Sequence, residues 1–179
     1  VQFNNESITF QQLYDRSMAM ASYLKKCGLK KGDRFGVLMS NRLEHIELDL
    51  VAAFGGFIKV PLNYRLHPKE HEYMIENANV SLLIGEQELI EPIELDSQVD
   101  SLYMGDDYDE KLRRHEGEEV RVDIDEDDLF VIMYTSGTTG NPKGVMLSHR
   151  NIISSALALN LACEVDRHDI IGHVAPLTH

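Results

Sequence analysis

Leu129-Phe-Val-Ile-Met-Tyr134 is the clearest buried strand in this chain of 179 residues, and it runs directly into Thr135-Ser-Gly-Thr-Thr-Gly-Asn-Pro-Lys-Gly144. A short run that is apolar at every position is typical of a strand covered on both faces, as in a parallel sheet. The glycines, the proline and the hydroxyl residues that follow predict a loop. The stretch therefore predicts a ligand-binding loop at the end of a buried strand, where α/β proteins bind ligands.

The segments on either side of this strand alternate between helix and strand patterns. Apolar residues at helical spacing predict helices over residues 10–24, 44–57, 68–77 and 151–163. Thr9 and Gln12 form a capping box for the first helix, and Gly28 stands where that helix would end. Short apolar runs predict strands over residues 35–39, 59–62, 80–84, 145–147 and 170–175, with Pro61 restricting the pairing of its strand. The alternation predicts an α/β fold with a mainly parallel sheet flanked by helices.

Composition limits the partners that the chain can bind. Hydrophobic residues make up 43% of the chain and charged residues 26%, which is ordinary for a globular domain. The formal charge of −13 argues against a nucleic-acid partner, because phosphate backbones are bound by clustered Lys and Arg. Residues 91–128 hold 16 acidic and 4 basic side chains, and we expect them to form a solvated surface excursion. A cation site at residues 123–128 is the alternative, but the glycine and spaced ligands of a calcium loop are missing.

Cysteine content and hydropathy predict a cytoplasmic location without a transmembrane segment. Cys27 and Cys163 are far apart and form no CxxC pair, which indicates neither a zinc site nor a disulfide scaffold and fits a reducing compartment. The longest apolar stretches without charge, residues 50–58 and 152–163, are shorter than the ~20 residues that a membrane span needs. The chain starts with neither a signal-peptide pattern nor a Met, so we expect it to begin inside a longer protein.

The segment from Thr135 to Gly144 has the composition of a phosphate-binding loop. Its glycines permit positive φ and close approach of a ligand, and successive amide N–H groups can converge on an anion. Four hydroxyl side chains can donate to phosphate oxygens, and Lys143 adds a mobile positive charge. The loop fits neither GxxxxGK[ST], because Pro142 replaces the second Gly, nor GxGxxG. A plain flexible loop is the alternative, which the flanking apolar strand and Pro142-Lys143-Gly144 make the weaker interpretation.

The negative charge of the chain does not exclude phosphate binding at this loop. If Leu129–Tyr134 is a strand, it separates the acidic residues 123–128 from the loop by about 20 Å. The Debye length at physiological salt is about 8 Å, so local donors determine the affinity unless the fold brings the acidic residues back.

The loop resembles the signature motif of the adenylate-forming superfamily, which comprises acyl-CoA synthetases, peptide-synthetase adenylation domains and luciferases. The match runs unbroken from Ile132 to Lys143 and continues to His149. Leu29-Lys-Lys-Gly-Asp-Arg34, Val60-Pro-Leu-Asn63 and Pro176-Leu-Thr-His179 resemble the same family at their expected places. The resemblance covers essentially the whole chain and implies the first part of an acetyl-CoA synthetase-like N-terminal domain.

This resemblance implies a reaction in two steps. A carboxylic acid attacks the α-phosphorus of ATP to give an acyl-adenylate and pyrophosphate, and a thiol, usually that of CoA, then takes the acyl group. ATP, Mg²⁺ and CoA are the implied cofactor and co-substrates, and acyl-CoA synthesis implies a role in fatty acid metabolism. The loop residues expected to bind the ATP phosphates are Thr135, Ser136, Gly137, Thr138, Thr139, Gly140 and Lys143. Thr135 also matches a position assigned to magnesium in some relatives, and His179 matches a His that faces the acyl pocket.

The resemblance also implies that part of the active site lies outside this chain. Members of the superfamily are several hundred residues long, and their ribose-binding Asp, hinge and catalytic Lys follow later in the sequence. Residues 1–179 therefore correspond to an incomplete N-terminal, AMP-binding domain without the C-terminal domain, and we expect the fragment alone to be inactive. No catalytic residue is assigned within it.

Alternative functions stay open at this point. A peptide-synthetase adenylation domain or a luciferase-like enzyme would share the loop, although Pro176-Leu-Thr-His179 favours the ligases. A non-catalytic nucleotide-binding module with an acidic docking surface is an alternative of another class. The carboxylic acid, the thiol acceptor and the oligomeric state, a homo-oligomer included, are not determined by these residues.

Several histidines invite other interpretations. His67 and His71 have metal-ligand spacing, but Pro68 between them and the absence of an HExxH pattern favour surface polar residues. His149 begins a helix, whose N-terminus disfavours the charged form, so we expect a neutral structural residue. His168 and His173 stand near no nucleophile and carboxylate that would complete a triad.

Overall fold

The computed structural model describes residues 1–4, 6–135, 140–166 and 168–178. The helices are α1 (Phe10–Lys26), α2 (Glu44–Gly55), α3 (Pro68–Ala78), α4 (Gln87–Ile90), α5 (Asp106–Arg114) and α6 (His149–Cys163). The strands are β1 (Gln2–Phe3), β2 (Glu6–Ser7), β3 (Arg34–Leu38), β4 (Ile58–Pro61), β5 (Leu82–Gly85), β6 (Asp100–Tyr103), β7 (Leu129–Thr135) and β8 (Lys143–Ser148).

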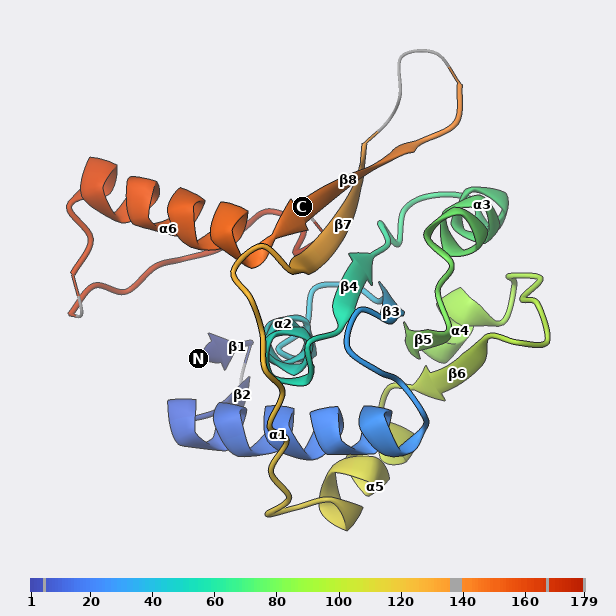
Figure 1. Ribbon diagram of the computed structural model, residues 1–179, viewed down its shortest axis with the longest axis horizontal. Helices are drawn as coiled ribbons and strands as arrows, with labels where there is room; N and C mark the ends of the chain where they lie inside the picture. The colour runs from blue at the N-terminus through green and yellow to red at the C-terminus, as the bar shows by residue number, and fades with distance from the viewer. Residues whose placement is uncertain (5, 136–139, 167, 179) are drawn as a thin grey trace.

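Within the described residues, six strands form a central sheet in the order β6-β5-β3-β4-β7-β8 (Figure 1). The five strands from β6 to β7 run parallel, and β8 returns antiparallel to β7. The predicted mainly parallel α/β sheet is therefore confirmed. Since β3, β4 and β7 all end on the same side, the loops that follow them meet at one edge of the sheet.

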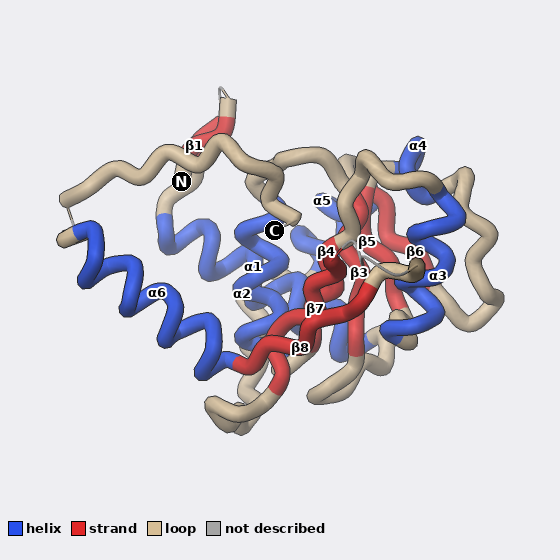
Figure 2. The backbone as a smooth tube through the Cα atoms, turned by 90° about the horizontal axis from the view of Figure 1, so that it is seen from above, coloured by secondary structure: helices blue, strands red, loops and turns tan. Residues whose placement is uncertain are grey.

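Alternating side chains of the strands build one hydrophobic cluster on each face of the sheet. Phe35, Val37 and Ile84 pack with apolar residues of α1, α2 and α5 on one face. Leu38, Val60 and Leu83 pack with residues of α3 and α4 on the other. Figure 2 shows the two helical layers on opposite sides of the sheet. Near-continuous apolar strands such as β3 follow from this burial on both faces.

Pro61 shapes the pairing of β4 as the sequence predicts. The backbone N–H of Ile58 donates to Asp33, directly before β3, and that of Leu62 donates to Val37 of β3, so the alternate residues of β4 face the opposite neighbour, β7. Pro61 lies on that second side, where its missing N–H removes a bond. The register between β4 and β7 accordingly consists of a single partner pair, Lys59 and Val131.

The acidic stretch differs from the predicted surface excursion. Its middle part supplies β6, which pairs with β5, and α5, whose Tyr108 and Leu112 are buried in the core. These two apolar residues stand four positions apart on one face of a helix that is otherwise charged. The charge count of the whole stretch hides this short pattern, so β6 and α5 are integral parts of the domain.

The segment from Ile170 to Ala175 is not a strand, contrary to the prediction. Ile170 and Val174 are each 99% exposed, and this run pairs with no strand among the described residues. Apolar composition alone favoured a strand, but a strand also needs a partner that supplies backbone hydrogen bonds.

The surface of α6 is unusually apolar. Its apolar side chains Ile153, Leu157 and Leu161 are exposed, and so is the apolar side chain of Met146 on β8. Cys27 and Cys163, at the ends of α1 and α6, are free and exposed. Among the described residues, no helix combines the length and apolarity needed to cross a bilayer.

Gly85→Ala should destabilise the protein by about 3 kcal/mol, because a Cβ there would lie 1.9 Å from the backbone oxygen of Leu38 and backbone at this strand end has no room to shift. Urea denaturation measures this loss. Gly172→Ala is the matched control, since no atom lies within 4 Å of its added Cβ. Equal midpoints for the two variants would contradict the close approach of β3 and β5.

Candidate functional site

The predicted phosphate loop connects two strands of an antiparallel hairpin. Thr135 at the end of β7 pairs with Lys143 at the start of β8, so both side chains lie on the same face of the hairpin. Gly140 has a φ of 129°, the positive value that the glycine-rich composition predicts. The predicted ligands Ser136, Gly137, Thr138 and Thr139 lie outside the described residues, as does His179.

Tyr134 anchors the base of this hairpin to α3. Its hydroxyl lies 2.6 Å from Asn77 Oδ1 and 3.2 Å from the carbonyl oxygen of Met74. Burial raises the pKa of Tyr134 to about 12, so the phenol stays protonated and donates at neutral pH. A Cβ at Gly144 would lie 2.8 Å from the side chain of Ile132 and 3.3 Å from the Tyr134 ring, so glycine at this position makes room for that ring.

A cavity of about 380 Å³ opens beside the hairpin base at the carboxyl ends of β4 and β7. The polar residues of its wall are Asn63, Glu70, Thr135, Thr178 and Tyr134, and apolar side chains complete the wall. Thr178 is only 4% exposed, and its hydroxyl has no hydrogen-bond partner within the described part of the chain. A buried hydroxyl without a partner costs free energy, which a bound ligand would recover by hydrogen bonding.

A second cavity of about 290 Å³ shares Pro61 and Thr178 with the first. Its wall is mainly apolar, but Lys59 and Asp49 supply a pair of charges. Lys59 Nζ lies 2.6 Å from Asp49 Oδ1 and 3.1 Å from the carbonyl oxygen of His45, and the Lys59 residue is buried. The other apolar residues of this wall are Phe130, Val131, Met133, Ile152 and Leu177.

The acidic residues 123–128 do not oppose anion binding at the hairpin loop. Asp128 directly precedes β7, at the opposite end from Thr135, and forms an ion pair of 2.6 Å with Lys31. Arg150 pairs with Asp127 at 2.7 Å and with Glu126 at 2.6 Å. The fold therefore leaves the acidic residues a strand length away from the loop and gives them local countercharges, as the screening argument requires.

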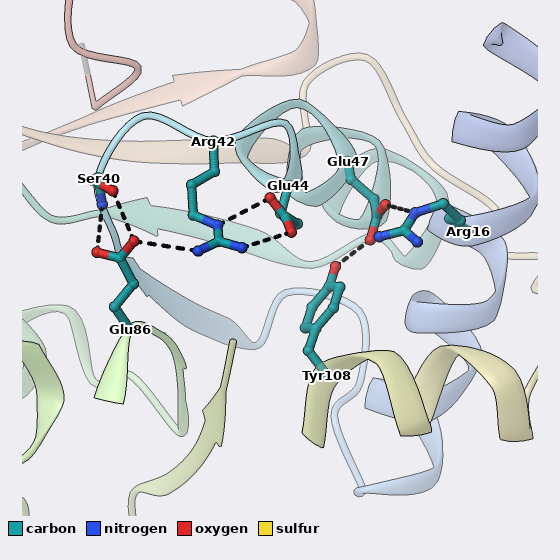
Figure 3. A network of polar contacts seen from close by, with 7 residues as sticks. All are labelled: Arg16, Ser40, Arg42, Glu44, Glu47, Glu86 and Tyr108. Atoms are coloured by element: carbon teal, nitrogen blue, oxygen red, sulfur yellow. Dashed lines mark hydrogen bonds and ion pairs between the residues drawn. The ribbon is translucent and has the colours of Figure 1, made fainter. Parts of the chain in front are cut away.

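Two groups of polar contacts join α1, α2 and α5 to one another and the end of β3 to the end of β5 (Figure 3). Arg16 on α1 and Tyr108 on α5 both donate to the buried Glu47 of α2, the former at 2.5 Å. Ser40, Arg42 and Glu86 join the ends of β3 and β5, with Ser40 Oγ donating to Glu86 at 2.7 Å. The loop after β3 is thereby held on both sides of Asn41.

Three histidines, His67, His71 and His149, make contacts within the fold. His67 caps α3 by accepting from the backbone of Lys69, and burial with the neighbouring Phe130 ring lowers the pKa of His149, which fits the neutral form predicted for it. The prediction of a surface position is wrong for His71. This residue is buried, and its Nε2 lies 2.9 Å from the carbonyl oxygen of Asn63. No cluster of metal-binding side chains occurs among the residues that the structure describes.

Comparison with known proteins identifies the family. The family model described as AMP-binding enzyme matches residues 1–179. The chain belongs to the AMP-binding enzyme family. It is 35% identical over 179 residues to 2-succinylbenzoate–CoA ligase of Bacillus velezensis, covering 99% of this chain and 36% of that protein. It is 33% identical over 157 residues to gramicidin S synthase 2 of Brevibacillus brevis, covering 86% of this chain and 3% of that protein.

Solved structures agree with this family membership. ATP-bound MatB from Rhodopseudomonas palustris superposes with a TM-score of 0.86 at 28% identity, covering 97% of this chain and 36% of that one. O-succinylbenzoate coenzyme A synthetase from Bacillus subtilis, in complex with AMP, gives a TM-score of 0.85 at 28% identity, covering 99% and 45%. The fold is thus that of the N-terminal domains of adenylate-forming enzymes, and the chain spans about a third of the length of the ligase relatives.

Sequence reasoning missed four residues of this region: Asn41, Lys59, Tyr134 and Thr178. Lys59 was visible as a charge inside an apolar run, which is the mark of a buried ion pair in a central strand. Asn41 gave no such signal, because its hydrogen bonds join segments more than 130 residues apart, and Thr178 gave none, because its burial depends on the tertiary structure.

His45 should make stability fall in weak acid. Burial, assisted by the charge of Lys59, lowers the pKa of His45 from 6.5 to about 4. The unfolded chain then binds the proton more readily than the folded chain, so stability is complete above pH 6.5 and decreases as the pH falls towards 4. The contribution lost between pH 7 and pH 5 is about 2 kcal/mol. Urea midpoints of wild type and His45→Gln at both pH values measure it.

His173→Gln, at an exposed position, is the control and should keep the wild-type pH dependence. If His45→Gln loses as much stability on acidification as wild type does, another group carries the effect.

Proposed function

We propose that this chain is the ATP-binding part of an acid–thiol ligase that makes an acyl-adenylate and then an acyl-CoA. The observation that carries the proposal is the β7–β8 hairpin, with its glycine, hydroxyl and lysine loop, beside a cavity at the carboxyl end of parallel strands. Membership of the AMP-binding family and the named CoA ligases among the relatives support it.

In this proposal the loop binds the leaving pyrophosphate. Thr135, Ser136, Gly137, Thr138, Thr139, Gly140 and Lys143 would hold the β and γ phosphates through hydroxyl, amide and ammonium donors. Charge grows on pyrophosphate as the bond to the α-phosphorus breaks, so these donors stabilise the transition state more than the bound ATP. The pairing of Thr135 with Lys143 supports a joint action, because both side chains leave the hairpin on one face.

The residues around the cavity suit a magnesium ion bound together with ATP. Thr135, Asn63 and Glu70 all line it and offer oxygen atoms, the ligands that Mg²⁺ prefers. A bound Mg²⁺ would neutralise phosphate charge. The residues of the chain itself would orient the phosphates and limit the access of water to the α-phosphorus.

The substrate is a carboxylic acid, and CoA is the proposed acceptor of its acyl group. Relatives include ligases named for 2-succinylbenzoate, 4-hydroxybutyrate and fatty acids, so fatty acid metabolism is one setting among several. Likeness to gramicidin S synthase 2 keeps a peptide-synthetase adenylation domain as the second candidate. Pro176-Leu-Thr-His179 favours the ligase, with His179 at the acyl pocket.

The complete reaction belongs to the whole protein. Because the ligase relatives are about three times as long as this chain, we place the ribose-binding carboxylate and the catalytic Lys in the part that corresponds to their remaining length. Residues 1–179 then form part of the N-terminal domain, and the fragment alone would be inactive. A cytoplasmic location stays a prediction, and the oligomeric state stays open.

Lys143→Ala in the full-length protein should lower kcat for ATP–pyrophosphate exchange by about 10²–10³-fold, the usual effect of removing one charge-stabilising donor. The KM for the carboxylic acid should change by less than about twofold, since the lysine acts on phosphate. Exchange is measured with 2-succinylbenzoate, 4-hydroxybutyrate and octanoate. Lys25→Ala, at the exposed end of α1, is the control and should behave as wild type. Undiminished exchange in Lys143→Ala would remove the proposed role of the loop.

A further inference from the structure

Asn41 forms both of its side-chain hydrogen bonds with one distant stretch of backbone. Its Nδ2 donates to the carbonyl oxygen of Ala175 at 2.9 Å, and the backbone N–H of Leu177 donates to its Oδ1 at 2.9 Å. The partners are separated from Asn41 by 134 and 136 positions in the sequence. A two-point contact of this kind fixes the position and the direction of the backbone that it holds.

The chain passes from an exposed to a buried environment at the segment that Asn41 holds. Before it, Ile170 and Val174 are 99% exposed, whereas Thr178 immediately after it is 4% exposed. Among the hydrogen bonds between described residues, those of Asn41 are the ones that tie residues 170–178 to the rest of the fold. The chain therefore reaches the cavities just after Ala175, with Leu177 lining one of them and Thr178 lining both.

The loop that carries Asn41 is itself fixed. Ser40 donates to Glu86 through its backbone N–H at 3.1 Å and through its hydroxyl at 2.7 Å. Arg42 pairs with Glu44 at 3.2 Å and with Glu86 at 3.5 Å (Figure 3). Both neighbours of Asn41 are thus bound to groups on α2 or at the end of β5, so its amide is held in place before any substrate binds.

Thr178 links this contact to the two cavities, because it lines both. The first cavity adjoins Thr135 at the hairpin, and the second has a mainly apolar wall that includes Leu177. An apolar wall suits the hydrocarbon part of a carboxylic acid rather than a phosphate. Displacement of residues 175–178 would therefore change the space for the acid and leave the hairpin donors in place.

We propose that Asn41 is a positioning residue that shapes the binding site of the carboxylic acid by holding residues 175–177. The inference rests on the proposed ligase function, and it separates two parts of the site. Asn41 governs the affinity for the acid through Thr178 and Leu177, whereas Lys143 on the hairpin acts on the phosphates of ATP.

The test compares Asn41→Ala and Asn41→Asp in the full-length protein, using the acid from the panel that supports the fastest ATP–pyrophosphate exchange. Losing both hydrogen bonds in Asn41→Ala should raise the KM for the acid about tenfold and the KM for ATP by a smaller factor, since Thr178 also lines the first cavity. Asn41→Asp keeps the acceptor for Leu177 but cannot donate to Ala175, so its KM for the acid should lie between the other two.

Ser81→Ala is the matched control. It removes another side-chain-to-backbone hydrogen bond, from Ser81 Oγ to the carbonyl oxygen of Arg34, at the amino ends of β5 and β3. Its KM for the acid should equal that of wild type, because Ser81 lines neither cavity. A rise of the acid KM in Ser81→Ala as large as in Asn41→Ala would overturn the inference, because general loosening would then explain both.

Hydrogen exchange of the backbone amide of Leu177 gives a readout independent of activity. The amide should be protected in wild type and in Asn41→Asp and should exchange faster in Asn41→Ala. An unprotected amide in wild type, or an unchanged acid KM in both variants, would overturn the proposal. Absence of ATP–pyrophosphate exchange with every acid in the wild-type protein would instead count against the ligase function. The hydrogen-exchange data would still report whether Asn41 holds the backbone of Leu177.

Discussion

The attachment of β7 to β4 determines where the candidate site lies. One parallel register pair, Lys59 with Val131, joins the hairpin to the rest of the sheet, because Pro61 cannot donate the next bond. Ile132 in the core and Tyr134 against α3 supply the remaining support. This arrangement separates a rigid sheet, made of β3, β4 and β5, from a hairpin that is held mainly at its base. Such an arrangement suits a loop that binds phosphate, because the strands fix the two ends of the loop from which the donors project.

Charge distribution follows the same division. Acidic residues dominate the chain, yet those nearest β7 are paired with Lys31 and Arg150 at the strand end remote from Thr135. Net charge therefore says little about the local preference of the loop, which depends on the amides, hydroxyls and lysine around it. It does argue against nucleic acid as a partner, because binding a phosphate backbone needs a broad basic surface.

Local sequence patterns predicted much of the fold. The capping box of Thr9 and Gln12 and the start of α3 at Pro68 lie where the sequence predicted them, because both signals act within one helical turn. The sequence did not reveal β6 and α5, where two buried residues stand among many charges, and the apolar run 170–175 suggested a strand that does not form. The residues proposed to bind phosphate were found from a contiguous motif. Asn41 and Thr178 were missed, since only tertiary structure brings residues so distant in sequence together.

The two exposed thiols at the ends of α1 and α6 have a practical consequence. Since Cys27 and Cys163 are the only cysteines of the chain and both are free, a thiol-reactive dye or spin label would attach at two defined points without prior mutagenesis. The label on Cys27 would report on α1 and the label on Cys163 on α6. The distance between the two labels would show whether α6 changes its position relative to α1 when nucleotide is added.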